Sequence, residues 1–167
     1  MATAAQRFAQ FALELELDAA LGEVVEAAKL HVLDVIGCGL AAHGLGIAGE
    51  GRATMSELGG EADTTVIGLD ARLPVPNAAF ANAMLCHGLD FDDTHSDSVS
   101  HVSVVVCPAA LAVAEARGAG GRELLTAIVG GNEVVTRVGM AASGAFHARG
   151  FHPTAICGIF GATTVAG

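Results

Sequence analysis

Apolar residues recur every three or four positions along most of the chain, which is the spacing of one face of an α-helix. A first amphipathic helix is predicted over about residues 3–17. A second, longer helix runs to about Ala42, and Asp18 is its candidate N-cap because a short acidic side chain can accept a hydrogen bond from a free backbone N–H. The segment 43–51 contains four glycines and ends this helix.

The rest of the pattern predicts shorter elements. Pro74 and Pro76 form a helix start signal, and segment 64–68 has strand propensity but no visible partner. Loops are expected over 92–103 and 143–152. Further helices are predicted over about residues 52–58, 77–89, 104–117 and 122–142, and from Pro153 onward. About six helices and at most one strand predict an all-α fold.

Small residues dominate this pattern. Together, 33 Ala and 22 Gly make up a third of the 167 residues, whereas there are seven Phe and no Trp or Tyr. Alanine favours helices and lets their axes approach closely, so the composition predicts tightly packed helices. The mean hydropathy of +0.54 excludes a disordered chain.

The charge balance excludes whole classes of partner. Eighteen acidic against eight basic residues give a net charge of −10, and Lys29 is the only lysine. Binding to nucleic acid or to an anionic membrane needs clustered cations, so neither is expected. The most apolar stretch, residues 102–114, is shorter than the ~20 residues of a membrane span. No secretory signal is visible, and a cytoplasmic location is predicted.

The four cysteines, Cys38, Cys86, Cys107 and Cys157, show no CxxC spacing and lie in apolar surroundings. Such cysteines are typical of a reduced protein core. We predict buried free thiols rather than disulfides or a zinc site.

Segment 87–101 concentrates the residues that carry chemistry, with four Asp and three His between two apolar segments. If the preceding helix continued to Asp93, then His87, Asp90 and Asp93 or Thr94 would share one face, and Asp92 would point elsewhere. An Asp grouped with His at the mouth of an apolar pocket is suited to acid/base catalysis.

Four other interpretations of this segment stay open. Asp92 and Asp93 could cap the next helix, or the loop could simply be solvated. The string DDTHSD (92–97) has the paired acids of the Mg²⁺-diphosphate sites in all-α isoprenoid synthases, although a second acidic motif and the necessary basic residues are missing. His87, His95 and His101 could bind a transition metal, but their spacings match no common ligand motif.

A second polar cluster lies in segment 146–154. There His152 comes directly before Pro153, which starts a helix, so free backbone N–H groups can face an anion beside it. Arg149 is the nearby cation.

Four long strings resemble the MmgE/PrpD family, which includes 2-methylcitrate dehydratase, cis-aconitate decarboxylase and iminodisuccinate epimerase. They are AAKLHVLDVIGCGLAAHG (27–44), HGLDFDDTH (87–95), CPAALAVAEARGAGGRELLTAIVGGNEVVTRVG (107–139) and GFHPTAICGIFGATTVAG (150–167). The resemblance implies an all-α domain that is followed in the family by an α+β lid domain. It also implies a homodimer with no metal or organic cofactor.

The same resemblance implies roles for individual residues. Asp90, His101 and His152 are the expected catalytic residues, although the family's usual HPS tripeptide reads His101-Val102-Ser103 here. Thr94, His95 and Arg149 are the expected substrate-binding residues.

The implied activity is that of a lyase acting on small di- or tricarboxylates. Dehydration of 2-methylcitrate is the default reaction, and decarboxylation or epimerisation are the other reactions that the resemblance allows. No charged residue follows Arg149, so we expect the chain to be the N-terminal part of the helical domain, cut within a helix. A net charge of −10 opposes binding of a tricarboxylate, and we therefore expect the isolated chain to be weakly active or inactive. The alternatives are an inert helical association module and, less favoured, a Mg²⁺-dependent enzyme that uses DDTHSD.

Overall fold

The computed structural model describes residues 1–70 and 72–167. Its helices are α1 (Ala4–Glu14), α2 (Gly22–Gly44), α3 (Gly49–Glu57), α4 (Val75–His87), α5 (Ser103–Arg117), α6 (Gly121–Met140), α7 (Ala145–Ala148) and α8 (Pro153–Ala166). A 3₁₀ turn, Leu17–Ala19, joins α1 to α2. The strands β1 (Thr64–Thr65) and β2 (Arg72–Leu73) have two residues each. The predicted all-α fold is therefore confirmed.

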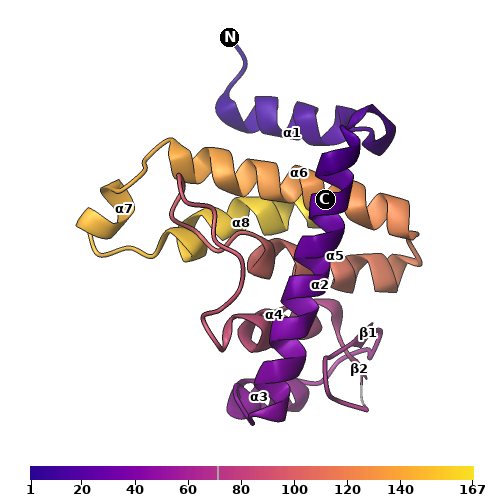
Figure 1. Ribbon diagram of the computed structural model, residues 1–167. Coiled ribbons are helices and arrows are strands. Elements are labelled where there is room, and N and C mark those ends of the chain that lie inside the picture. The colour runs from indigo at the N-terminus through magenta and orange to yellow at the C-terminus, as the bar shows by residue number, and fades with distance from the viewer. Residues whose placement is uncertain (71) are drawn as a thin grey trace.

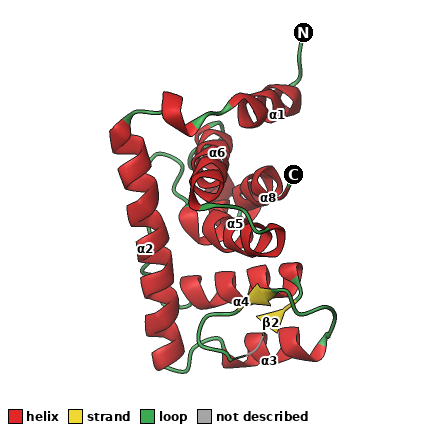
Figure 2. Ribbon diagram, turned by 90° about the vertical axis from the view of Figure 1, so that its right-hand side faces the viewer, coloured by secondary structure: helices red, strands yellow, loops and turns green. Residues whose placement is uncertain are grey.

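Helix α5 is the central element, because it packs against α4, α6 and α8. Figure 1 shows α1 beyond α6 at one end of the molecule and α3 at the other. In Figure 2, α5, α6 and α8 form one group, α3, α4 and the small sheet form another, and α2 runs along the side of both. Contacts of α2 with α4, α5 and α6 join the two groups into one body.

The core consists of aliphatic, alanine and cysteine side chains contributed by every long helix except α1. The main cluster contains Val35, Cys86, Val102, Val104, Val106, Cys107, Ala110, Ile128, Val135, Cys157 and Val165. A smaller cluster of Val66, Leu73, Ala78 and Ala81 lies between the sheet and α4. Valine is the commonest residue of the main cluster, and the buried members of both clusters include no aromatic side chain.

Two glycines let α5, α6 and α8 approach one another. A Cβ added to Gly131 of α6 would lie 2.7 Å from side-chain carbons of both Val106 and Val165. A Cβ added to Gly161 of α8 would lie 3.0 Å from the main-chain oxygen of Gly131. The backbone at these positions cannot move away without separating the helices, so the close contact depends on glycine.

The predicted cap of the second helix is wrong. Helix α2 begins at Gly22 and has Leu21 at its N-cap position. Asp18 lies in the 3₁₀ turn instead, and its carboxylate accepts a hydrogen bond from Arg122 at the start of α6. An ion pair with a residue far along the chain thus replaces the local cap that the sequence predicted.

Other boundaries also differ from the predictions. The strand within 64–68 does have a partner, since Thr64 pairs with Leu73 in an antiparallel ladder. The segment 143–152, predicted as a loop, contains the four-residue helix α7. Helix α4 ends at His87, two residues before the predicted end, and this difference decides how the polar segment is arranged.

The four cysteines are free and buried, as predicted. Burial raises the pKa of the Cys86 thiol to about 12, so this thiol is protonated and unreactive at neutral pH. Within residues 1–70 and 72–167, no single helix is long and apolar enough to cross a membrane. Helices α2 and α3 together reach that length and apolarity, but they bend by 96° between them.

We expect Gly131→Ala to destabilise the chain by about 1–3 kcal/mol, because the added methyl group overpacks the α5–α6–α8 contact. Gly37→Ala on the exposed side of α2 is the matched control, since a Cβ there meets open space. It should raise stability by up to about 1 kcal/mol through helix propensity. Urea unfolding followed by circular dichroism measures both. Equal effects of the two substitutions would contradict the packing argument.

Candidate active site

The polar segment is shaped by an abrupt end of α4. His87 is the last helical residue, and the backbone N–H of Asp90 donates to its carbonyl oxygen over 2.9 Å. Asp90 itself has φ of +51°, in the left-handed region that Asp tolerates better than most side chains. The chain therefore leaves the helix axis at Asp90, and residues 88–102 form a loop that leads to α5.

A buried carboxylate lies at the centre of this loop. The side chain of Asp92 has no exposed surface and contacts two imidazoles. Nδ1 of His87 lies 2.9 Å from Oδ1 of Asp92, and Nδ1 of His101 lies 3.1 Å from Oδ2. The two rings stand edge to face with their centroids 4.9 Å apart.

The structure brings two of the predicted site residues, Asp90 and Thr94, next to a third, His101. Nε2 of His101 lies 3.4 Å from Oδ1 of Asp90, whose side chain is 80% exposed. The hydroxyl of Thr94 is 3.4 Å from Nδ1 of the same ring. The backbone N–H of His101 donates to Oγ1 of Thr154 in the first turn of α8, over 2.9 Å, and this bond ties the loop to that helix.

The predicted residue His152 completes the cluster from another element. It is the N-cap residue of α8, and its ring centroid lies 6.1 Å from that of His87 and 6.5 Å from that of His101. Desolvation lowers the pKa of His152, and the positive charges of His87 and His101 lower it further. At neutral pH His152 is therefore a neutral imidazole, able both to accept and to donate a hydrogen bond.

Two predicted substrate-binding residues lie apart from these contacts. His95 forms a local turn in which its Nδ1 lies 2.9 Å from Oγ of Ser98, and it lines a separate cavity between α2 and α6. Arg149 is exposed at the C-terminal end of α7. The roles proposed for both residues stay predictions.

His87 and Asp92 belong to the cluster but were not among the predicted site residues. A helix that continued to Asp93 would direct Asp92 away from His87, and this was the arrangement that the sequence predicted. The early end of α4 and the left-handed Asp90 reverse the orientation, so Asp92 faces both imidazoles. The sequence signal that could have shown this is Gly88 directly after His87, since glycine often marks the end of a helix.

The neighbouring carboxylate, Asp93, has a structural role. Its Oδ1 accepts from the backbone N–H of Ser103 over 3.1 Å and its Oδ2 from the Ser103 hydroxyl over 2.8 Å, at the N-terminus of α5. Nδ1 of His31 on α2 lies 3.2 Å from Oδ2. The prediction that an acid of this pair holds the following helix is thus confirmed for Asp93.

The pKa values of His31 and Asp93 are shifted in opposite directions in the folded chain. Burial raises the pKa of Asp93, but hydrogen bonds from His31 and Ser103 outweigh that effect and leave it below its ordinary value. The hydrogen bond to Asp93 raises the pKa of His31, against the opposing effect of burial.

The carboxylates of DDTHSD do not converge on one point. Asp92 faces His87 and His101, whereas Asp93 faces α2 and the start of α5, and Asp97 is exposed. A Mg²⁺-diphosphate site needs several carboxylates around the same ion. Among the described residues, the group with metal-ligand geometry is instead His87, Asp92 and His101, whose ligand atoms lie within 4.8 Å of one another.

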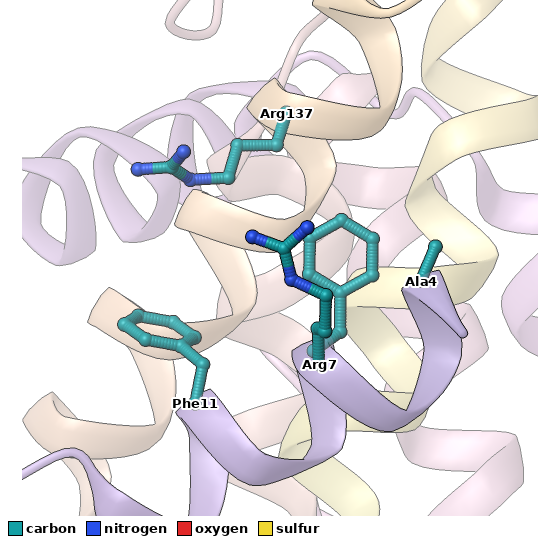
Figure 3. A pocket seen from close by; sticks show the side chains of 5 residues that line it. Ala4, Arg7, Phe11 and Arg137 are labelled. Atoms are coloured by element: carbon teal, nitrogen blue, oxygen red, sulfur yellow. The ribbon is translucent and has the colours of Figure 1, made fainter. Parts of the chain in front are cut away.

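Two cavities help to locate binding surfaces. One of about 360 Å³ beside the cluster is lined mostly by apolar side chains, and His87 and Thr154 open onto it. Another of about 320 Å³ lies between α1 and α6, where Arg7 and Arg137 extend from the two helices (Figure 3). The residues that line this cationic cavity, Ala4, Arg7, Phe8, Phe11 and Arg137, include none of the predicted site residues.

The geometry can be compared with known proteins. Residues 6–167 match the MmgE/PrpD N-terminal domain, and the chain belongs to the MmgE/PrpD family. It is 31% identical over 144 residues to the cis-aconitate decarboxylase-like protein oryM of Aspergillus oryzae, a match that covers 81% of this chain and 30% of that protein. It is 33% identical over 153 residues to cis-aconitate decarboxylase of Homo sapiens, a match that covers 86% of this chain and 31% of that protein. The Mus musculus protein of the same name is 30% identical over 149 residues, a match that covers 86% of this chain and 30% of that protein. The chain thus spans less than a third of the length of these relatives.

The His31–Asp93 pair makes a pH-dependent contribution to stability. Because the pKa of His31 is raised from 6.5 by folding, its contribution is complete below pH 6.5 and is lost as the pH rises through the raised value. We therefore expect His31→Gln to destabilise the chain more at pH 5 than at pH 8. Urea midpoints at both pH values measure this difference.

Lys29→Gln on the same helix is the control, because the exposed Lys29 pairs with Glu26 of its own helix rather than with Asp93. Its effect on the urea midpoint should be the same at pH 5 and pH 8. A pH-independent effect of His31→Gln would show that the ion pair does not contribute.

Proposed function

We propose that this chain carries part of the active site of a lyase that acts on small di- or tricarboxylates. The observation that supports this most directly is that Asp90 and His101 of the loop 88–102 converge with His152, from a distant segment, at one end of α5 and α8. Family membership supports the same class of chemistry. An inert association module gives no reason for a buried carboxylate and three imidazoles to be gathered in one place.

The proposed chemistry needs a group that moves a proton. Loss of CO₂ or of water next to a carboxylated carbon passes through a state in which an electron pair is delocalised into a neighbouring carboxylate. A proton on Nε2 of His101 would lie between that nitrogen and Asp90, at a contact of 3.4 Å that faces outward. We assign proton transfer to the Asp90–His101 pair, and hydrogen bonding to substrate carboxylates to neutral His152 and to Thr94.

The relatives' names indicate which substrate to test first. They are cis-aconitate decarboxylases or are described as similar to one, so decarboxylation of cis-aconitate is the first reaction to examine. Dehydration of 2-methylcitrate is the second, since both reactions share the proton-transfer step above. We propose that neither reaction needs a metal or organic cofactor.

The site needs positive charge beyond that in this chain. A tricarboxylate must overcome a net charge of −10, and Arg7 and Arg137 line a different cavity. We propose that the cations come from the part of the relatives that this chain does not span, or from a second subunit in a homodimer. The 167-residue chain alone should then turn over substrate weakly or not at all.

Asp90→Asn and His152→Ala should each lower kcat/KM for cis-aconitate by about 10²–10⁴-fold in the protein at its natural length, because each removes a group that transfers or donates a proton. Asparagine also tolerates a positive φ, so Asp90→Asn preserves the loop. Steady-state kinetics with cis-aconitate and with 2-methylcitrate measures the effect.

Asp97→Asn is the matched control, because Asp97 is an exposed carboxylate in the same loop. It should leave kcat/KM within about twofold of the wild type. Retention of kcat/KM within about tenfold in both Asp90→Asn and His152→Ala would refute the proposed roles. Unchanged assembly with no activity on any carboxylate would favour the association module instead.

A further inference from the structure

We propose that Asp92 is a positioning residue that fixes the tautomer and direction of both His87 and His101. In this arrangement each imidazole carries a hydrogen on Nδ1 and directs Nε2 away from the buried carboxylate. The inference rests on the proposed function, which it deepens by assigning how the proton-transferring imidazole is held.

The contacts of His101 determine where its hydrogen lies. Its Nδ1 is 3.1 Å from Oδ2 of Asp92 and 3.1 Å from the main-chain oxygen of the same residue. The main-chain oxygen can only accept, so Nδ1 must be the donor in this hydrogen bond, and the carboxylate of Asp92 lies beside the same N–H as an ion-pair partner. In the neutral ring Nε2 has the free lone pair, and a proton taken up there lies between Nε2 and Oδ1 of Asp90, 3.4 Å away.

His87 is held in the same way from the other side. Its Nδ1 lies 2.9 Å and 3.2 Å from the two carboxylate oxygens of Asp92 and is therefore also a donor. The ring is partly exposed and opens onto the apolar cavity beside Thr154. Asp92 thus sets the tautomer of both imidazoles, through its carboxylate at His87 and through its main-chain oxygen, with the carboxylate beside it, at His101.

The burial of Asp92 explains why this arrangement is rigid. Its side chain has no exposed surface, so it cannot exchange its contacts with the two imidazoles for water. Rotating either ring would take its Nδ1 away from a buried carboxylate, which is strongly unfavourable. His152, in contrast, faces other histidines and the exposed Asp90, without a buried carboxylate among the groups that shift its pKa.

A buried Asp in this position also favours proton transfer. When Nε2 of His101 takes up a proton, the ring becomes a cation, and the adjacent carboxylate of Asp92 stabilises it. When Nε2 gives up the proton, the ring returns to the tautomer that it had before. Asp92 need not change its own protonation or touch the substrate.

The first experiment reads the tautomers directly. Two-bond ¹H–¹⁵N NMR spectra of the imidazoles, recorded on the natural-length protein above the titration range of histidine, should show Nδ1–H for His87 and His101. An Nε2–H tautomer at His101 would overturn the proposal. So would a stoichiometric bound metal ion detected by elemental analysis, because His87, Asp92 and His101 would then be ligands. This measurement needs no variant and is decisive even if a substitution at the buried site prevents folding.

The second experiment replaces Asp92 by Asn, which keeps the shape but removes the charge and can present an N–H to one ring. We expect kcat to fall by about 10²–10⁴-fold, KM to stay within about threefold, and at least one of the two rings to change tautomer. Asp97→Asn is the control, with kcat and both tautomers unchanged. A folded Asp92→Asn protein with kcat within about threefold of the wild type would overturn the proposal.

Failure of the positioning role and failure of the proposed function give different kinetic results. If Asp90→Asn and His152→Ala abolish turnover while Asp92→Asn does not, the positioning role is wrong and the proposed function stands. If all three variants retain turnover, the proposed function fails together with the positioning role.

Discussion

The carboxylate of Asp93 is the contact on which the rest of the structure depends. It accepts two hydrogen bonds from Ser103 at the start of α5 and pairs with His31 on α2, so it fixes the central helix against the long lateral one. The backbone N–H of Asp93 also donates to Asp34, one helical turn further along α2. Because Asp92 is the preceding residue and its side chain faces the opposite way, the same short segment that anchors the scaffold also places the buried carboxylate of the candidate site.

Most of the helices could be predicted because their apolar residues repeat at helical spacing and are closely packed. The predictions failed where a distant partner or a single backbone angle decides the outcome. Asp18 would cap a helix in isolation, but Arg122 holds it from 104 residues away. Thr64 has a strand partner, Leu73, that no local pattern distinguishes. For the site, the types and proximity of Asp90, His101 and His152 could be inferred, whereas the orientation of Asp92 depends on one left-handed residue, which periodicity does not encode.

Histidines in this chain show how surroundings decide the chemistry of a residue type. His31 forms a half-buried ion pair that connects two helices. His95 closes a local turn with Ser98. His101 lies between a buried and an exposed carboxylate, and His152 has other imidazoles beside it, which lower its pKa. One residue type thus serves as an ion-pair partner, as part of a turn and as a member of the candidate site.

The left-handed backbone at Asp90 has a consequence for how this fold can diverge. A position with φ of +51° accepts few side chains, chiefly Asp, Asn and Gly. In the genetic code, Asn and Gly are each one base change away from Asp. The substitutions that this turn tolerates best therefore also remove the exposed carboxylate, and they are the ones that point mutation reaches most readily. A lineage with this architecture can lose that acid in a single step while keeping its helices, its packing and its recognisable sequence.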